Sequence, residues 1–381
     1  MAGALDGVLV LEVAGYLSGP YATMLLGDLG ADVVKVERPA RGDAFRKWDG
    51  AGFGPTFASV NRNKRSVALD LGSEDGRASF ERLVRRADVL VCNLRPSTLA
   101  SLGLRYEELA GLNPRLVYCA ISGFGEDATA GDRPGYDTIG QALSGLLSLL
   151  TDVDAPELPG ISIADHVTGV FACYGVLAAL FARERTGRGQ KVDTSLLQAT
   201  VSFVQEGAAR ALAGGGAPAR GSRPASAQAY AFVAGDGLPF VVHLSSPPRF
   251  WEGLTEAIGH DELRDDPRFA TRPARVENYD ELRTLLAGIF SEATREEWLS
   301  RLTARDVPCA PIRTVAEALQ DDDVRAFGFP VELRHPAADG PTLLAGSPVR
   351  LAETPVSYRL PPPLLGEHTD EVLQELAGSE R

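Results

Sequence analysis

One acidic residue, Asp165, stands between two apolar stretches, directly before a long apolar run with helical spacing. The run reaches Phe181 and ends in Arg183, Glu184 and Arg185, after which the glycine-containing segment 186–189 follows. Basic residues followed by glycine are typical of a helix C-terminus. The pattern predicts a buried helix with Asp165 in its first turn or at its N-cap.

An aspartate at the start of a helix is most often a capping residue, and this structural interpretation of Asp165 stays open here. Two features favour chemistry instead. The residues before it, Ile161, Ile163 and Ala164, are apolar, which predicts a partly dehydrated carboxylate. The helix N-terminus favours the ionised form of that carboxylate. An ionised and partly dehydrated carboxylate is a nucleophile that can form covalent acyl intermediates.

Composition excludes several classes of protein. The chain has 381 residues, of which 44% are hydrophobic and 23% charged, with a net charge of -13. These values are ordinary for a soluble globular protein, and the acidic balance argues against a nucleic-acid partner. We expect no segment with the length and purity of a membrane span and no signal peptide. The scattered cysteines and histidines predict neither disulfides nor a metal site, and favour a cytoplasmic location.

Short apolar runs alternate with helical patterns through residue 122. The expected strands are 8–13, 32–37, 88–92 and 116–121, and the helices between them include 21–29 and 73–87. This alternation predicts an α/β protein with a doubly wound, Rossmann-like parallel sheet. Ligands bind such sheets beyond the carboxyl ends of the strands, which is where Arg38 and Arg95 stand.

The turn after the first strand allows a dinucleotide-binding alternative. Its glycines, Gly15 and Gly19, have the spacing G-x-x-x-G and not G-x-G-x-x-G, although Glu37 could imitate the acid that binds ribose. The imperfect pattern disfavours this alternative. A basic run, Arg62 to Arg65, stands before a further apolar strand, and it is either a solvated loop or a phosphate contact.

The second half of the chain has a different pattern. Residues 192–211 are expected to form one helix, and the Gly-, Pro- and Ala-rich stretch 214–226 to be a linker. Beyond it, a hairpin, three helices and a short strand predict a smaller α+β module. The expected elements are strands 229–233 and 240–244, helices 248–258, 279–290 and 295–305, and strand 307–312.

Several ordered segments, from Leu5 to the C-terminus, together resemble class III CoA-transferases of the CaiB/BaiF type. They are GVLVLEVAGYLSGPYATMLLGDLGADVVKVERP, NRNKRSVALDL, LRPS, YCAISGFG, GYDTIGQALSG, ADHVTG, RTGRGQKVDTSL, VPCAPI and LLGEHTDEVL. That family includes formyl-CoA and crotonobetainyl-CoA:carnitine transferases, with the α-methylacyl-CoA racemases as relatives. The resemblance implies an interlocked homodimer. It also implies a large Rossmann-like domain from 1–213 and 313–381, with the small α+β domain 227–312 inserted after the linker.

The resemblance also implies a reaction. Asp165, within ADHVTG, matches the catalytic carboxylate, which forms an aspartyl anhydride and then an aspartyl-CoA thioester before CoA passes to a carboxylic acid. Acyl-CoA and small carboxylic acids are the implied partners, with no metal and no tightly bound cofactor, since CoA is a substrate. The implied CoA contacts are Leu17, Ser18, Arg38, Leu69, Asp70, Leu71, Gly72, Asn93, Leu94, Arg95, Gly135, Tyr136 and Asp137.

Two departures from the family pattern matter. Leu17 stands where many transferases carry glutamine, and the glycine-rich loop of the formyl-CoA enzymes has no clear match, so formyl-CoA and oxalate are disfavoured as substrates. Racemase relatives carry a histidine base where this chain has Tyr136, and a phenol with a pKa of about 10 is a poor base. His166 is interpreted as structural, since neighbouring residues of a helix point in different directions. α-Proton exchange and CoA binding without chemistry remain the alternatives.

Overall fold

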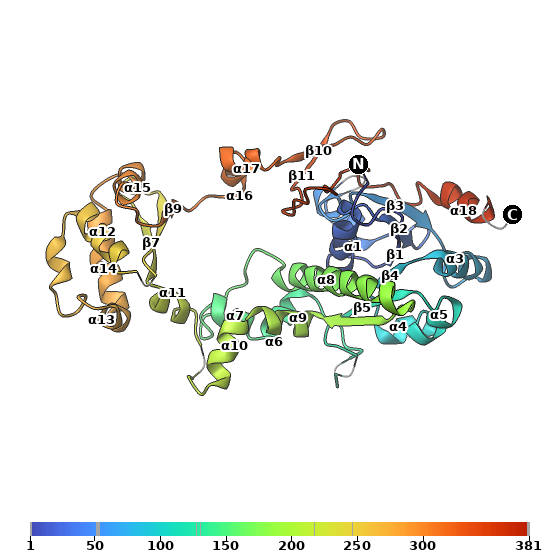
Figure 1. Cartoon of the computed structure of the whole chain (residues 1–381), viewed down its shortest axis with the longest axis horizontal. Coiled ribbons are helices and arrows are strands. Elements are labelled where there is room, and N and C mark those ends of the chain that lie inside the picture. Colours follow the sequence, from blue (N-terminus) through green and yellow to red (C-terminus); the bar gives the residue numbers. More distant parts are fainter. Residues whose placement is uncertain are drawn as a thin grey trace. The chain divides into compact units, whose positions relative to one another are not determined.

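The computed structural model describes residues 2–50, 54–126, 128–129, 131–216, 218–245 and 247–378. It divides into two compact units. The first comprises Met1–Leu147, Leu158–Ala209 and Asp322–Arg381, and the second Ser148–Glu157 and Arg210–Asp321. The first unit therefore takes in segments from both ends of the chain (Figure 1). The domain boundaries expected from the sequence stay a prediction, and Ala217 of the expected linker lies outside the described residues.

A six-stranded parallel sheet forms the centre of the first unit, with the order β3-β2-β1-β4-β5-β6. Its strands are β1 (Leu9–Val13), β2 (Asp32–Glu37), β3 (Lys64–Ala68), β4 (Val89–Cys92), β5 (Val117–Ser122) and β6 (Lys191–Ser195). This is the order of a Rossmann sheet, in which the chain reverses its direction of winding between β1 and β4. The predicted doubly wound α/β sheet is confirmed.

Helices cover the sheet on both sides because successive side chains of a buried strand face opposite layers. The helices of this unit are α1 (Ser18–Asp28), α2 (Pro55–Ala58), α3 (Glu74–Arg86), α4 (Pro96–Ser101), α5 (Tyr106–Leu112), α6 (Asp137–Leu143), α8 (Ile163–Thr186), α9 (Leu196–Phe203), α17 (Asp322–Ala326) and α18 (Thr369–Gly378). Val10 and Val33 belong to one apolar cluster with helices α1 and α8, whereas Leu11 and Val34 belong to another with α3, α5 and α18 (Figure 1). Residues Ala44–Lys47 form a 3₁₀ helix, and β10 (Val331–Leu333) pairs with β11 (Thr342–Leu344).

The expectation of a single helix across residues 192–211 was wrong. Strand β6 pairs in parallel with β5, and α9 begins only after Ser195, whose side chain accepts a hydrogen bond from the Gln198 N–H. Val192 packs against the core while Asp193 is exposed, an alternation typical of a strand. Serine is a favoured N-cap, so the change from strand to helix at Ser195 has a local cause.

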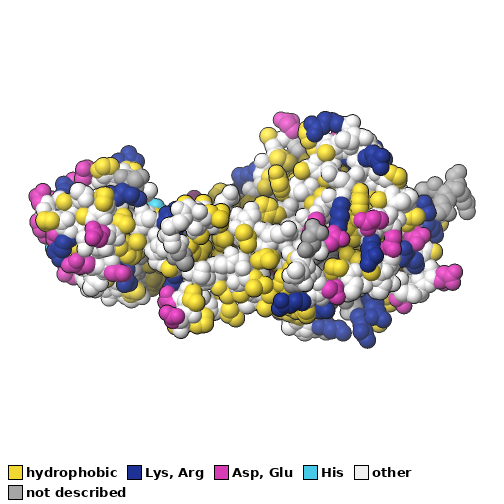
Figure 2. All heavy atoms as spheres, turned by 90° about the horizontal axis from the view of Figure 1, so that it is seen from below, with side chains coloured by type: hydrophobic (Ala, Val, Ile, Leu, Met, Phe, Trp, Pro, Cys, Tyr) yellow, Lys and Arg dark blue, Asp and Glu magenta, His cyan; other side chains and the backbone are white. Residues whose placement is uncertain are grey.

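Helix α8 is less buried than its apolar sequence predicts. It packs on α1, α9, β5 and β6, but Val170, Tyr174 and Phe181 remain 50%, 68% and 68% exposed. On the face of the molecule in Figure 2, hydrophobic side chains (yellow) lie close together along the lower middle of the view, where few charged side chains are seen. The expectation that no segment has the length and composition of a membrane span was also wrong for α8. This is weak evidence of a membrane location, since core helices of globular proteins meet the same criterion.

The second unit has a three-stranded antiparallel sheet with the order β7-β8-β9. The expected hairpin is confirmed as β7 (Ala229–Val233) and β8 (Pro239–His243), and β9 is Cys309–Pro311. Its helices are α11 (Ser222–Ala227), α12 (Pro248–Ile258), α13 (Arg272–Glu277), α14 (Tyr279–Phe290), α15 (Arg295–Thr303) and α16 (Val315–Ala318), with a 3₁₀ helix at Asp261–Arg264. Two further helices, α7 (Leu146–Leu150) and α10 (Gln205–Leu212), span the unit boundaries. The core of the second unit is aromatic, with Phe290 edge-on to both Phe240 and Trp298.

Candidate active site

The loops that follow β1 and β4 are joined where the sheet reverses its winding. Asn93, after β4, accepts a hydrogen bond from the Gly15 N–H at 3.0 Å and donates one to the Gly15 carbonyl at 2.7 Å. Parallel sheets bind ligands in the crevice beyond the strand ends at such a point. The amide of Asn93 therefore fixes the backbone where a ligand site is expected.

Two neighbouring cavities lie beyond these strand ends. The Asp165 cavity, lined by Asp165 among others, has a volume of about 370 Å³. The Arg38 cavity, which contains Arg38, has a volume of about 600 Å³. Four residues line both cavities and form their common boundary: Tyr16, Asn93, Leu94 and Thr98.

Most residues singled out from the sequence line one of these two cavities. Those beside Asp165 are Ser18, Asn93, Leu94, Arg95, Gly135 and Tyr136. Those beside Arg38 are Leu69, Asp70, Leu71, Gly72, Asn93 and Leu94. Leu17 and Asp137 line neither cavity. Leu17 precedes the first residue of α1, and the Asp137 carboxylate accepts a hydrogen bond from the Asp165 N–H at 3.1 Å.

Asp165 is not the N-cap of its helix, so the capping interpretation was wrong. Ser162 occupies the N-cap position of α8, and Asp165 is the third helical residue. The backbone N–H of Asp165, which lacks a partner within the helix at this position, donates to Asp137. The side chain of Asp165 is thus left to face the cavity that it lines.

Burial raises the pKa of Asp165 to about 7, the negative charge of Asp137 adds to this rise, and a hydrogen bond with Ser18 opposes it. The expectation that the helix N-terminus favours the ionised carboxylate therefore needs correction. Dehydration and a neighbouring like charge outweigh the favourable helix N-terminus. At neutral pH the carboxyl group is divided between its neutral and ionised forms.

Gln141 and Tyr16 are site residues that the sequence reasoning missed. The Gln141 side chain donates to the Asp137 carboxylate and to the Ile161 carbonyl, so it holds the residue that contacts Asp165. Its position four residues after Asp137 on α6 was a usable signal, because such residues are neighbours on a helix. Tyr16 follows β1 directly, and its position at a strand end was the corresponding signal.

The basic run Arg62–Arg65, whose last two residues begin β3, is neither a solvated loop nor part of either cavity, so both interpretations of it were wrong. Its side chains are mostly buried and pair with acidic residues of the first unit. The pairs are Arg62 with Asp28, Lys64 with Glu12 and Arg65 with Asp32, at N–O distances of 2.6, 2.8 and 2.6 Å. Buried charges need such partners, and these arginines and lysines supply them.

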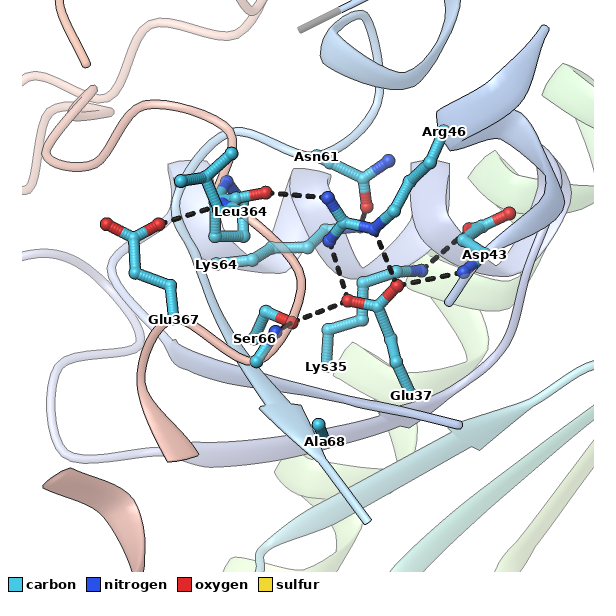
Figure 3. Close-up of polar contacts among 12 residues, drawn as sticks. Lys35, Glu37, Asp43, Arg46, Asn61, Lys64, Ser66, Ala68, Leu364 and Glu367 are labelled. Atoms are coloured by element: carbon cyan, nitrogen blue, oxygen red, sulfur yellow. Dashed lines mark hydrogen bonds and ion pairs between the residues drawn. The ribbon is translucent and has the colours of Figure 1, made fainter. Parts of the chain in front are cut away.

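A network of buried charges extends from the sheet to the loop after β1. Lys35 contacts Glu12 at 2.5 Å and Asp43 at 2.8 Å, and donates to the Ala14 carbonyl at 3.0 Å. Asp43 in turn accepts a hydrogen bond from the Tyr16 N–H at 3.0 Å. Figure 3 shows Lys35 and Asp43 together with a neighbouring pair, in which Arg46 binds both carboxylate oxygens of Glu37. The network ties the strands to Tyr16, one of the four residues at the boundary of the two cavities.

The cysteine and histidine side chains have local roles in the described part of the chain. Cys92, Cys119 and Cys173 are buried free thiols. The His166 ring lies edge-on to Tyr21, and its Nδ1 is 2.7 Å from the Ser162 carbonyl oxygen. Among the described residues, no group of three or more His, Cys, Asp or Glu side chains could hold a metal ion.

A Rossmann-type sheet with a half-buried carboxylate in a cavity beyond its strand ends defines a class of ligand-binding α/β protein with a candidate nucleophile. The model of CoA-transferase family III matches residues 5–369, so the chain belongs to this family and is a class III CoA-transferase. The resemblance seen in the sequence motifs is confirmed.

Relatives of known activity match almost the whole chain. The chain is 36% identical to the succinyl-CoA:glutarate CoA-transferase of Mus musculus, over 98% of this chain and 86% of that protein. It is 37% identical to the acetyl-CoA:oxalate CoA-transferase of Acetobacter aceti, over 99% and 97% of the two chains. A CAIB/BAIF family protein from Brucella suis has a similar structure, with a TM-score of 0.87, 34% identity, and coverage of 99% and 100%.

Proposed function

We propose that this enzyme moves CoA from an acyl-CoA donor to a small carboxylic acid, with Asp165 as the nucleophile. The observation that carries the proposal is the half-buried Asp165 carboxylate in a cavity that adjoins the larger Arg38 cavity. The first cavity has room for a small acid, and the second for part of a CoA. The names of the relatives, which act on glutarate and oxalate, support a short carboxylic acid as acceptor.

In the proposed reaction, the Asp165 carboxylate attacks the thioester carbonyl of the donor and expels CoA thiolate, which gives a mixed anhydride. The thiolate then attacks the aspartyl carbonyl, forms an aspartyl-CoA thioester and releases the donor acid. The acceptor carboxylate attacks this thioester, giving a second anhydride and free thiolate. Attack of the thiolate on the acyl carbonyl yields the new acyl-CoA and restores Asp165. Each step exchanges one acyl bond for another, so no atom is oxidised or reduced.

The cavity walls suggest how CoA is held. Arg38 and Arg95 provide charge-assisted hydrogen bonds to its phosphates, which a chain with a net charge of -13 needs locally. The segment 69–72 lines the Arg38 cavity, and Asn93 and Leu94 line both cavities, as a ligand that spans them requires. Ser18, Gly135 and Tyr136 contact the acyl end beside Asp165, while Leu17 and Asp137 act from behind the cavity wall.

We also propose that the protein acts as an interlocked homodimer of a two-domain chain in the cytoplasm. The exposed apolar side chains of α8, Val170, Tyr174 and Phe181, support an interface with a second copy, since monomers rarely leave such groups uncovered. Light scattering on the purified protein would give the mass of a dimer, and the mass of a monomer at all concentrations would contradict this arrangement.

A covalent adduct is expected on Asp165 when an acyl-CoA donor is supplied at low acceptor concentration. The adduct should appear as a mass shift of the peptide that contains Asp165, and hydroxylamine should trap it. The acceptors to screen are glutarate, succinate, mesaconate and oxalate, the last included because two relatives are named for it although Leu17 disfavours it.

The same preparation separates transfer from the two alternatives. In deuterated water, a chiral 2-methylacyl-CoA should keep its α-hydrogen, because Tyr136 stands in place of the histidine base of racemases. Rapid deuterium uptake without an adduct or an acceptor would favour a racemase. CoA binding with neither adduct nor exchange would favour a module without chemistry.

The rate of transfer is expected to rise with pH, to be half-maximal near pH 7 and to level off above about pH 8. Only the ionised form of Asp165 is nucleophilic, and a pKa of about 7 leaves that form incomplete at lower pH. The measurement is kcat/KM for the donor from about pH 5.5 to pH 9, which reports ionisations of the free enzyme. A profile that is flat across about pH 6 to 8 would show that Asp165 is ionised throughout.

A further inference from the structure

Tyr16 has a backbone conformation that is unusual for its residue type. Its φ angle is 61°, in the left-handed region, and the residue is 38% exposed. Bulky residues rarely adopt this conformation, and they keep it only where the surrounding structure enforces it. Such positions cluster at active sites and ligand clamps, so Tyr16 calls for a functional explanation.

The surrounding structure holds three consecutive residues of this loop. The Ala14 carbonyl accepts a hydrogen bond from Lys35, both backbone groups of Gly15 bind Asn93, and the Tyr16 N–H donates to Asp43. Asp43 is itself held by Lys35 at 2.8 Å. The position of Tyr16 is therefore set by side chains of β2 and of the loops that follow β2 and β4.

The ring of Tyr16 is fixed by two other aromatic rings. It lies edge-on to Phe45 and to Tyr136, each at 5.6 Å between ring centroids. Tyr16 lines both cavities, whereas Tyr136 lines only the Asp165 cavity. The side chain of Tyr16 thus stands between the two cavities, with its neighbour Tyr136 on the Asp165 side.

The phenol of Tyr16 is a neutral hydrogen-bond donor at physiological pH. A hydrogen bond with Tyr136, and then burial, raise the pKa of Tyr16 above its ordinary value. A neutral donor suits a site that must bind an anion next to Asp165, because it does not form an ion pair with the nucleophile. Arg95 and Arg133 line the same cavity and supply positive charge for the anion.

We propose that Tyr16 is a specificity-determining residue, whose hydroxyl group binds the carboxylate of the acceptor acid and whose ring limits that acid to a short chain. The proposal rests on the proposed CoA transfer and adds a residue to it. It follows from the placement of Tyr16 at the boundary of the two cavities, from its locked ring, and from the contacts that impose its backbone conformation.

The test is direct binding of glutarate to the enzyme saturated with CoA, by calorimetry, in wild type and in Tyr16→Phe. The phenylalanine keeps the ring and the backbone contacts and removes only the hydroxyl group. Loss of a hydrogen bond to a charged group is expected to weaken glutarate binding by about tenfold or more, with CoA affinity within about twofold of wild type. Tyr106→Phe, at a half-buried position of α5 outside both cavities, removes a hydroxyl group elsewhere in the first unit and is the matched control.

Tyr16→Gly is a second variant that the fold tolerates, because glycine adopts a positive φ without strain. It removes the ring, so binding of an eight-carbon dicarboxylate relative to glutarate should rise about tenfold. Three results would each overturn the role of Tyr16. Wild type and Tyr16→Phe could bind glutarate equally well, Tyr16→Phe could lose affinity for CoA alone, or wild type could bind no acid. Failure of wild type to transfer CoA would instead reject the proposed function, since acid binding is measured without turnover.

Discussion

Replacing Asp165 with alanine is expected to lower kcat for CoA transfer by at least about a thousandfold. The variant loses the carboxyl group on which all three proposed covalent intermediates form, and no other carboxylate lines the Asp165 cavity among the described residues. The fold should survive because the side chain lies at a cavity and not in an apolar cluster. Isotope exchange between a labelled acyl-CoA and the acceptor measures the loss, and a CoA titration should show binding close to that of wild type.

The pH dependence of the stability of Asp165→Ala provides an independent test, because the direction of the change is known. The pKa of Asp165 is raised in the folded state from 3.8 to about 7, so its contribution to stability is present below about pH 4 and is lost as pH rises through 7. The melting temperature of the alanine variant minus that of wild type should therefore be larger at pH 8 than at pH 5. Asp370→Ala changes an exposed first-turn aspartate of α18 and should keep full activity. Substantial residual exchange in Asp165→Ala would reject the nucleophile assignment.

The sheet and the second unit could be predicted because their signals are local. Each buried strand is a short apolar run, and its neighbours in the chain are helices with caps such as Ser73, whose side chain accepts a hydrogen bond from the Gly76 N–H. The hairpin of β7 and β8 surrounds Gly235-Asp236-Gly237, with Gly237 at a φ of 78°, as a tight turn requires. The loops at the strand ends follow from the same pattern, so the region of the site was predictable too.

The charged interior could not be predicted, because a sequence does not show which distant partner a charge will meet. In the sequence, Lys64 belongs to a basic run of the kind found on protein surfaces, yet the structure buries it fully against Glu12 of another strand. The exposure of Tyr174 on α8 could not be predicted either, because a helix has the same apolar pattern whether it packs on its own core or on a second chain. The pKa of Asp165 depends on Asp137, which only the fold brings close.

Lys35→Met is expected to lower the free energy of unfolding by about 3–5 kcal/mol, the usual cost of breaking a buried ion pair from one side. Lys35 is fully buried, and it contacts two carboxylates, those of Glu12 and Asp43. Burial by itself raises the pKa of Glu12, and Lys35 and Lys64 reverse this and hold the pKa below its ordinary value. Without Lys35, the excess negative charge has no counterpart in the core. Urea denaturation followed by circular dichroism gives the difference.

The matched controls distinguish the buried network from a general effect of removing a lysine. Lys47→Met alters an exposed lysine of the neighbouring 3₁₀ helix and should change stability by less than about 1 kcal/mol. The double variant Lys35→Met, Asp43→Asn removes a negative charge together with its partner and should cost less than the sum of the single changes. It keeps an oxygen that can accept from the Tyr16 N–H. Additive costs would show that Lys35 and Asp43 act independently, and that the network does not hold the loop between the two cavities.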